Sequence, residues 1–136
     1  MNRKKGVVAI IYYGEKVLIG KKRSDSLKSF AGKWHIPGEG LNPRESDEQG
    51  LVRLMKEEAG SDLTEVTLTL GKFICKSYSP SGRILKWYEC FASNDKICYG
   101  GDLEDAKYVN KKEVLKECDS KVVCHWPKQV IDYFNS

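Results

Sequence analysis

The sequence predicts an α/β or α+β domain built on a mixed β-sheet. Two observations support this class: apolar and β-branched runs of strand length flank one central helical segment, and a second amphipathic segment closes the chain. The 136 residues are 40% hydrophobic and 31% charged, which is typical of a folded globular domain and not of a disordered or fibrous chain. We therefore expect one domain over residues 1–136.

The strands are predicted from β-branched and apolar runs that are bounded by turn residues. Two hairpins and one later strand are expected, at Val7–Tyr13 with Lys16–Lys22, at Leu68–Tyr78 with Arg83–Ala92, and at Ala106–Val109. Between the hairpins, Lys33–Ile36 should be briefly extended. Pro37–Arg44 contains two glycines and two prolines, so we expect irregular backbone there.

A central helix should begin after Ser46. Ser46 followed by Gln49 is a capping-box pattern, and the acidic residues that follow Ser46 suit the first turn of a helix. The helix should stop at Gly60. At 100° per residue its core-facing stripe is predicted to contain Leu51, Val52, Met55 and Ala59.

Two shorter helices are expected in the last quarter of the chain. Lys111–Glu117 reads as a short helix. Trp126–Phe134 has Pro127 in its first turn and its apolar residues on one side, which is typical of an amphipathic helix.

Charge and cysteine content exclude several classes. The net charge of +4 is mild for a chain with 23 basic and 19 acidic residues, so a nucleic-acid or membrane partner is not expected. The five cysteines are an odd number without a C-x-x-C pair, which argues against a disulfide framework or zinc ribbon and favours the reducing cytoplasm. No segment approaches the ~20 apolar residues that span a bilayer.

Adjacent carboxylates close the central helix. Glu57 and Glu58 repel each other and oppose the helix macrodipole. A divalent cation, Mg²⁺ or Mn²⁺, is one way to compensate them. The alternative is that they are solvated charges paired with Arg53 or Lys56.

The segment around this helix resembles the Nudix box of the Nudix (MutT-like) hydrolases, whose pattern is G-x5-E-x7-R-E-U-x-E-E-x-G-U with U a bulky aliphatic. Over residues 39–61, six of the nine fixed positions match, namely Glu45, Arg53, Met55, Glu57, Glu58 and Gly60. The family's Trp-x-x-Pro-Gly lead-in is present as residues 34–38. Three positions depart: Glu39 replaces the first glycine, Ser61 the last aliphatic, and Leu54 the glutamate after the arginine.

The resemblance implies an α/β/α sandwich that hydrolyses a nucleoside diphosphate linked to another group, with Mg²⁺ or Mn²⁺. It implies that Glu57, Glu58 and the Gly38 carbonyl hold the metal, and that Arg53 and Glu45 form a bracing ion pair. The substrate would be a small-molecule nucleotide. A homodimer is compatible, since dimers are common among relatives.

Leu54 weakens the catalytic interpretation, because leucine cannot ligate a metal or accept a proton. Some family members take the base from a loop residue six positions before the aromatic of the late strand. Six positions before Tyr108 lies Asp102, with Glu104 close by, although Gly100-Gly101-Asp102 also reads as a simple turn. Glu39 could restore lost charge. The alternatives are a non-catalytic Nudix-fold protein that binds a nucleotide or RNA, and a scaffold with a plain acidic surface.

Overall fold

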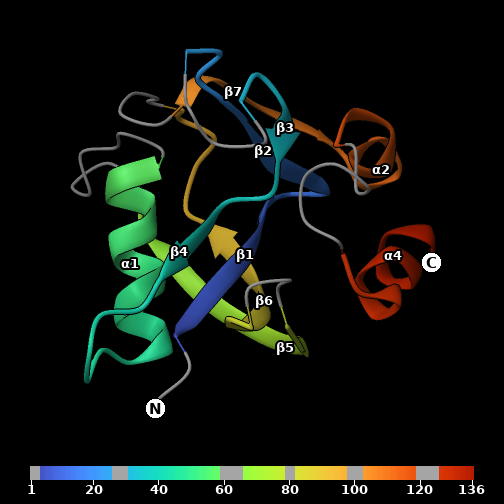
Figure 1. Cartoon of the computed structure of the whole chain (residues 1–136). Coiled ribbons are helices and arrows are strands. Elements are labelled where there is room, and N and C mark those ends of the chain that lie inside the picture. The colour runs from blue at the N-terminus through green and yellow to red at the C-terminus, as the bar shows by residue number, and fades with distance from the viewer. Residues whose placement is uncertain (1–3, 26–30, 59–65, 79–81, 98–102, 119–125) are drawn as a thin grey trace.

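The computed structural model describes residues 4–25, 31–58, 66–78, 82–97, 103–118 and 126–136 (Figure 1). The side chains of Glu39 and of residues 55–58 lie outside this description. The elements in chain order are β1 (Lys5–Tyr13), β2 (Lys16–Lys22), β3 (Trp34–His35), β4 (Gly38–Gly40), α1 (Asp47–Glu58), β5 (Leu68–Tyr78), β6 (Ile84–Ala92), β7 (Leu103–Asn110), the 3₁₀ turn η1 (Lys111–Glu113), α2 (Val114–Glu117) and α4 (Lys128–Asn135).

The strands form one mixed sheet, as the sequence predicts. Its order is β3-β2-β1-β6-β5, with β4 paired to β1 and β7 paired to β2. The β1–β6 pair is parallel, and the other pairs are antiparallel. Helix α1 covers one face of the sheet, and α2 and α4 lie on the other (Figure 1).

Alternation along β1 divides the core between these two faces. Val7, Ala9 and Ile11 pack with Leu51 and Leu54 of α1. The intervening residues of β1 pack toward α2 and α4, in a cluster that contains Val8, Ile10, Val17, Ile19, Trp87, Val114, Trp126, Val130 and Phe134. The predicted amphipathic C-terminal helix is confirmed, although Pro127 stands at its N-cap and not in its first turn.

The prediction of irregular backbone over Pro37–Arg44 is wrong at its start. Gly38–Gly40 forms β4 against β1, where the Ala9 amide donates to the Pro37 carbonyl at 2.9 Å and the Leu41 amide donates to the Lys5 carbonyl at 2.8 Å. A Cβ on Gly38 would lie 3.3 Å from the Val7 carbonyl oxygen, so the glycine allows the close approach that local patterning does not reveal.

One further boundary differs from the predictions, and another lies outside the described residues. The strand expected at Ala106–Val109 extends over Leu103–Asn110, because β2 offers pairing partners along its whole length. Helix α1 is described to Glu58, and the predicted stop at Gly60 lies outside the described residues.

The predicted core stripe of α1 is wrong in part. Leu51 is buried as expected, but Val52 is 43% exposed and Leu54 is fully buried. Gly50 lies on the same side of α1 as Leu54, and a Cβ there would come within 2.3 Å of Leu41 Cδ2. Because Gly50 has no side chain, Leu41 can pack closely against the face of α1 that Gly50, Leu51 and Leu54 share. The predicted positions of Met55 and Ala59 lie outside the description.

Within the described ranges, no helix has the length and apolar character needed to cross a membrane. The side chains of Cys75, Cys90 and Cys118 are buried and are not in disulfides. Burial raises the pKa of the Cys75 thiol, and it raises that of Cys90 to about 12. These two thiols are therefore protonated near neutral pH and are poor nucleophiles.

Candidate functional site

A tight turn connects β4 to α1. The Glu45 amide donates to the Asn42 carbonyl at 3.0 Å, with Pro43 and Arg44 as the central residues. Arg44 has φ of 67°, which matches the third position of a type II turn, a position that normally takes glycine. The turn delivers Glu45 to the side of α1.

The N-terminus of α1 is fixed by its own cap and by β6. The predicted capping box is confirmed: the Ser46 amide donates to Gln49 Oε1 at 2.9 Å, and the Gln49 amide donates to Ser46 Oγ at 3.1 Å. Asp47 accepts hydrogen bonds from the Tyr88 hydroxyl and, at 3.2 Å, from Lys86 Nζ. Burial, together with the bond to Asp47, raises the pKa of Tyr88 to about 12. Helix α1 is therefore anchored to the sheet at its first turn.

Arg53 and Glu45 form a bidentate ion pair across the loop. Arg53 Nε donates to Glu45 Oε2 at 3.0 Å, and Nη2 donates to Oε1 at 2.9 Å. Arg53 Nη2 also donates to the Gly40 carbonyl, and the Asn42 amide donates to Glu45 Oε1 at 2.9 Å. The hydrogen bonds from Arg53 and Asn42 lower the pKa of Glu45 to about 2. We call the four groups of Gly40, Asn42, Glu45 and Arg53 the brace.

Two carbonyls of β4 point away from β1, and the brace hydrogen-bonds one of them. In an antiparallel pair, every second residue exchanges backbone hydrogen bonds with its partner. Pro37 and Leu41 are bonded to β1, so Gly38 and Gly40 stand at non-bonded positions and their carbonyls face outward from the β1 ladder. Arg53 takes the Gly40 carbonyl. The Gly38 carbonyl lies on the same edge.

Leu54 is embedded in hydrocarbon. Its side chain is fully buried, in the cluster that also contains Val7, Ile11, Leu18 and Leu51. The position next to Arg53 therefore adds apolar packing to the α1 face and contributes no charge.

Glu104 is held by the end of β2. It accepts hydrogen bonds from the Ser24 amide and, at 2.7 Å, from Ser24 Oγ, and it lies 3.6 Å from Lys21 Nζ. The bonds from Ser24 lower the pKa of Glu104. Its ionised carboxylate thus links β7 to the segment after β2.

Comparison with known proteins connects this geometry to a family. The family model described as NUDIX domain matches residues 2–126. The chain belongs to the Nudix family. It is 28% identical over 102 residues to the nucleoside triphosphatase NudI of Salmonella newport, an alignment that covers 68% of this chain and 72% of that protein.

Solved Nudix structures share the fold. A NUDIX hydrolase from Nitrosomonas europaea superposes with a TM-score of 0.76 at 18% identity, covering 99% of this chain and 72% of that one. A NUDIX-family hydrolase from Clostridium perfringens gives 0.70 at 18% identity, with 99% and 98% covered. The MutT protein of Methanosarcina mazei Go1 gives 0.69 at 19% identity, with 99% and 94% covered. The α+β sandwich with a mixed sheet is therefore the Nudix fold.

Several candidate site residues lie outside the described part of the structure. These are the side chains of Glu39, Glu57 and Glu58, and the whole of Asp102. Among the described residues, no group of three or more His, Cys, Asp or Glu side chains could hold a metal ion. The structure brings Arg53 and Glu45 together as the resemblance implies, and it leaves Glu104 in a separate contact with Ser24.

The sequence interpretation missed two members of the brace. Asn42 and the Gly40 carbonyl were not singled out, although both bind the predicted ion pair. The signal for Asn42 was the Asn-Pro dipeptide, which favours a turn. Nothing in the sequence marked Gly40, because its role follows from the register of β4 on β1.

Proposed function

We propose that this Nudix chain is a pyrophosphohydrolase that hydrolyses a nucleoside diphosphate linked to another group, using Mg²⁺ or Mn²⁺. Nudix hydrolases as a family generally use such divalent ions. The observation that carries the proposal is the brace, because Arg53 joins the outward edge of β4 to α1. This is the arrangement needed to hold a loop carbonyl and the end of an acidic helix at a fixed separation.

The proposed metal ligands are Glu57, Glu58 and the Gly38 carbonyl. Helix α1 and β4 run in opposite directions along each other (Figure 1). From Arg53, four helical residues rise about 6 Å to position 57. From Gly40, two strand residues advance about 6.6 Å to Gly38. The bond from Arg53 to the Gly40 carbonyl aligns these two residues along the helix axis. Backbone position 57 would then lie beside Gly38, whose carbonyl is on the outward edge.

The bound ion would neutralise part of the diphosphate charge and make the phosphorus atom that water attacks more electrophilic. The chain's own contribution is to keep its ligands fixed while that charge arrives. The Arg53 fork sets the loop, and the ionised Glu45 holds the fork over the whole neutral pH range. Because Leu54 replaces a glutamate of the box, the site has one carboxylate fewer, and we expect weaker metal binding than in a chain with the full box.

The base is proposed to be Asp102, with Glu39 as a source of additional negative charge. Asp102 follows two glycines, which suits a segment that moves toward a bound substrate. Glu104 is not proposed as the base, because it already accepts hydrogen bonds from the Ser24 amide and hydroxyl.

The test is a hydrolysis assay with Mg²⁺ or Mn²⁺ on nucleoside triphosphates, dinucleotides and sugar nucleotides. Nucleoside triphosphates come first, because the Salmonella relative is named a nucleoside triphosphatase. We expect turnover that is abolished by Glu58→Gln and retained in Glu48→Gln, which alters an exposed carboxylate at the other end of α1. A complete absence of phosphate or nucleotide release with either metal would argue strongly against the proposal.

A second candidate function is binding of a nucleotide or RNA without hydrolysis. The observation that favours it is the full burial of Leu54 in the apolar cluster under α1. Tight binding in EDTA, together with no turnover in Mg²⁺ or Mn²⁺, would support it. Binding that weakens steeply with salt would identify RNA phosphates as the contact.

We further propose that the chain is one Nudix domain over residues 1–136 and that it works in the cytoplasm. Cys75, Cys90 and Cys118, which are buried and not in disulfides, suit a reducing compartment.

A further inference from the structure

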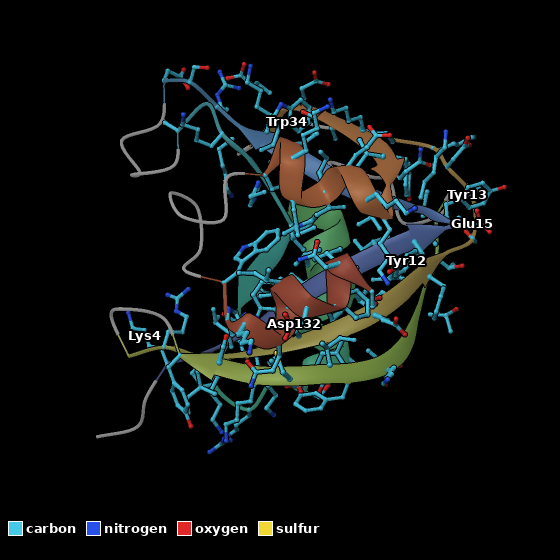
Figure 2. All side chains as sticks on the ribbon, turned by 90° about the vertical axis from the view of Figure 1, so that its right-hand side faces the viewer. Lys4, Tyr12, Tyr13, Glu15, Trp34 and Asp132 are labelled. Carbon is cyan, nitrogen blue, oxygen red and sulfur yellow. The ribbon has the colours of Figure 1, made fainter. Side chains whose placement is uncertain are left out.

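A pocket of about 890 Å³ opens at the end of the sheet where the β1–β2 hairpin turns. Its walls come from the end of β1, the second half of β6 and the junction of β7 with η1. Tyr12 and Glu15 mark this end of the molecule in Figure 2, on the side that carries α2 and α4. We call it the hairpin-end pocket. Its volume falls within the range of small-molecule sites.

The hairpin-end pocket is separate from the brace. Tyr12 packs with the cluster under α2 and α4, whereas the brace lies on the α1 side. Along β1, Tyr12 is four residues from Val8, which pairs with Gly38. Four strand residues span about 13 Å. A ligand here would therefore occupy a different face of the sheet from the proposed metal ligands.

The floor of the pocket is aromatic. The Tyr12 and Phe91 rings stack with centroids 6.0 Å apart and planes inclined by 27°. Phe91 also covers Gly71, where a Cβ would come within 2.6 Å of the Phe91 ring. The ring is thus positioned from two sides, yet 45% of Phe91 remains exposed. An exposed, positioned ring is a platform for a planar group or a cation.

A chain of hydroxyl groups fixes a carboxylate in the wall. The Tyr133 hydroxyl donates to Glu89 Oε2 at 2.5 Å, and the Tyr12 and Tyr133 hydroxyl oxygens are 2.5 Å apart. Since the proton of Tyr133 goes to Glu89, Tyr12 must donate to Tyr133. Glu89 thus accepts one hydroxyl proton, from Tyr133, which leaves its remaining lone pairs for donors from a ligand.

The charges around the pocket are unbalanced toward the negative. The lining contains three carboxylates and two ammonium groups, from Glu15, Glu89, Glu113, Lys111 and Lys112.

One of the ammonium groups is already engaged. Lys111 Nζ lies 4.4 Å from the centroid of the Tyr133 ring and donates to Ser136 Oγ at 3.2 Å. A phosphate group would add to the negative excess and would have to compete for Lys111. A singly charged cation would neutralise the excess and would not compete for Lys111.

We propose that the hairpin-end pocket binds a guanidinium group, stacked on Phe91 and hydrogen-bonded to Glu89. A guanidinium is planar, so it can stack on a ring, and it donates in a fork that matches a carboxylate. An ammonium ion can do neither as well. The guanidinium is supplied either by a free small molecule or by an arginine side chain in a peptide. This proposal is independent of hydrolysis at the Nudix box.

The first test compares butylguanidinium with butylammonium by isothermal titration calorimetry on the full chain. The two probes differ only in the head group. We expect butylguanidinium to bind at least fivefold more tightly. Free arginine and a blocked Gly-Arg-Gly peptide then distinguish the two sources, because the tighter of these two ligands shows whether the pocket prefers a free molecule or a peptide. AMP serves as the anionic competitor and should not displace butylguanidinium.

The second test uses variants of the pocket. Phe91→Leu should weaken butylguanidinium about fivefold, and Glu89→Gln about tenfold. Glu15→Gln changes an exposed carboxylate at the rim and tests the charge requirement even if Glu89→Gln does not fold; we expect a loss of about twofold. Glu48→Gln, on α1, is the matched control. The proposal would be overturned by equal affinity for the two head groups, by displacement with AMP, or by a loss in Glu48→Gln as large as in Phe91→Leu.

Discussion

The two faces of the sheet use their polar groups differently. On the α1 face, Arg53 and Glu45 form a charged fork that joins a loop to a helix, above a core that includes Leu54. On the other face, the Tyr12–Tyr133–Glu89 chain joins α4 to β1 and β6 with only one charged member. The first arrangement fixes backbone groups around a proposed metal site. The second fixes a single anion beside an aromatic platform. Variants on the two faces should therefore separate hydrolysis from stability and from cation binding.

The largest effect is expected from Leu54→Glu, which restores the usual box residue. Because Leu54 is fully buried among apolar side chains, the new carboxylate should lower the free energy of unfolding by about 4 kcal/mol in the absence of metal. If Glu57 and Glu58 hold Mg²⁺ beside this position, the ion should stabilise the variant more than the wild type. Urea unfolding with Mg²⁺ and with EDTA measures both effects.

Leu54→Gln is the control for Leu54→Glu, since it brings similar bulk without the charge. We expect Mg²⁺ to stabilise Leu54→Gln no more than the wild type. Any hydrolytic activity should rise in Leu54→Glu alone. An equal response of all three proteins to Mg²⁺ would place position 54 away from the metal.

The next effect is expected from breaking the brace. Arg53→Ala removes the fork to Glu45 and the bond to the Gly40 carbonyl. We expect kcat/KM to fall about 100-fold, because groups that orient metal ligands matter nearly as much as the ligands. Arg53→Lys should recover little, since an ammonium cannot form the fork. Steady-state kinetics on the preferred nucleotide measure this. A loss of less than threefold in Arg53→Ala would remove the brace from the proposed mechanism.

The α4 face supplies the contrasting variant, Tyr133→Phe. It deletes the hydroxyl between Tyr12 and Glu89 and should lower the free energy of unfolding by about 1.5 kcal/mol. Hydrolysis should be unchanged, because this hydroxyl lies on the face opposite α1. Tyr13→Phe, which alters an exposed tyrosine next to Tyr12 on the β1–β2 hairpin, is the control for stability. A matching loss of activity in Tyr133→Phe would show that the two faces are coupled.

The features that the sequence predicted correctly depend on short stretches of chain. The hairpins and the Ser46–Gln49 capping box are defined by residues only a few positions apart, so local patterns are enough. The Arg53–Glu45 pair was reached through the family resemblance, and the structure confirms the contact.

The features that the sequence did not predict depend on approaches between distant segments. Gly50 leaves room for Leu41 beside the buried Leu54, and Gly38 lies close to the Val7 carbonyl in the β1–β4 pair. The hairpin-end pocket collects residues from β1, β6 and η1, which no spacing along the chain relates. Periodicity identifies an element and its apolar side, but the contact that sets its rotation comes from elsewhere in the fold.

A smaller effect, on the pH dependence of stability, is expected from Glu45→Gln on the α1 face. Hydrogen bonds from Arg53 and the Asn42 amide lower the pKa of Glu45 from its ordinary value of 4.5 to about 2. A carboxyl whose pKa is lowered by folding stabilises the protein above its unfolded pKa and loses that contribution as the pH falls toward its folded pKa. The difference in urea midpoint between wild type and Glu45→Gln should therefore be full above pH 5 and shrink between pH 4.5 and 2. Glu48→Gln, which removes a carboxylate of α1 outside the brace, is the control, and a pH dependence as large as that of Glu45→Gln would show that the brace is not its source.

The smallest effect is expected at Arg44, in the turn that leads to the brace. Its φ of 67° is a left-handed conformation that costs an L-residue with a side chain about 1 kcal/mol. Arg44→Gly should relieve that cost and, after the extra freedom of glycine in the unfolded chain, raise the free energy of unfolding by about 0.5 kcal/mol. Arg44→Val should lower it, because a β-branched residue fits this conformation worst. Urea unfolding of both variants measures the difference, and equal midpoints for glycine and valine would show that the turn changes its conformation to suit the residue.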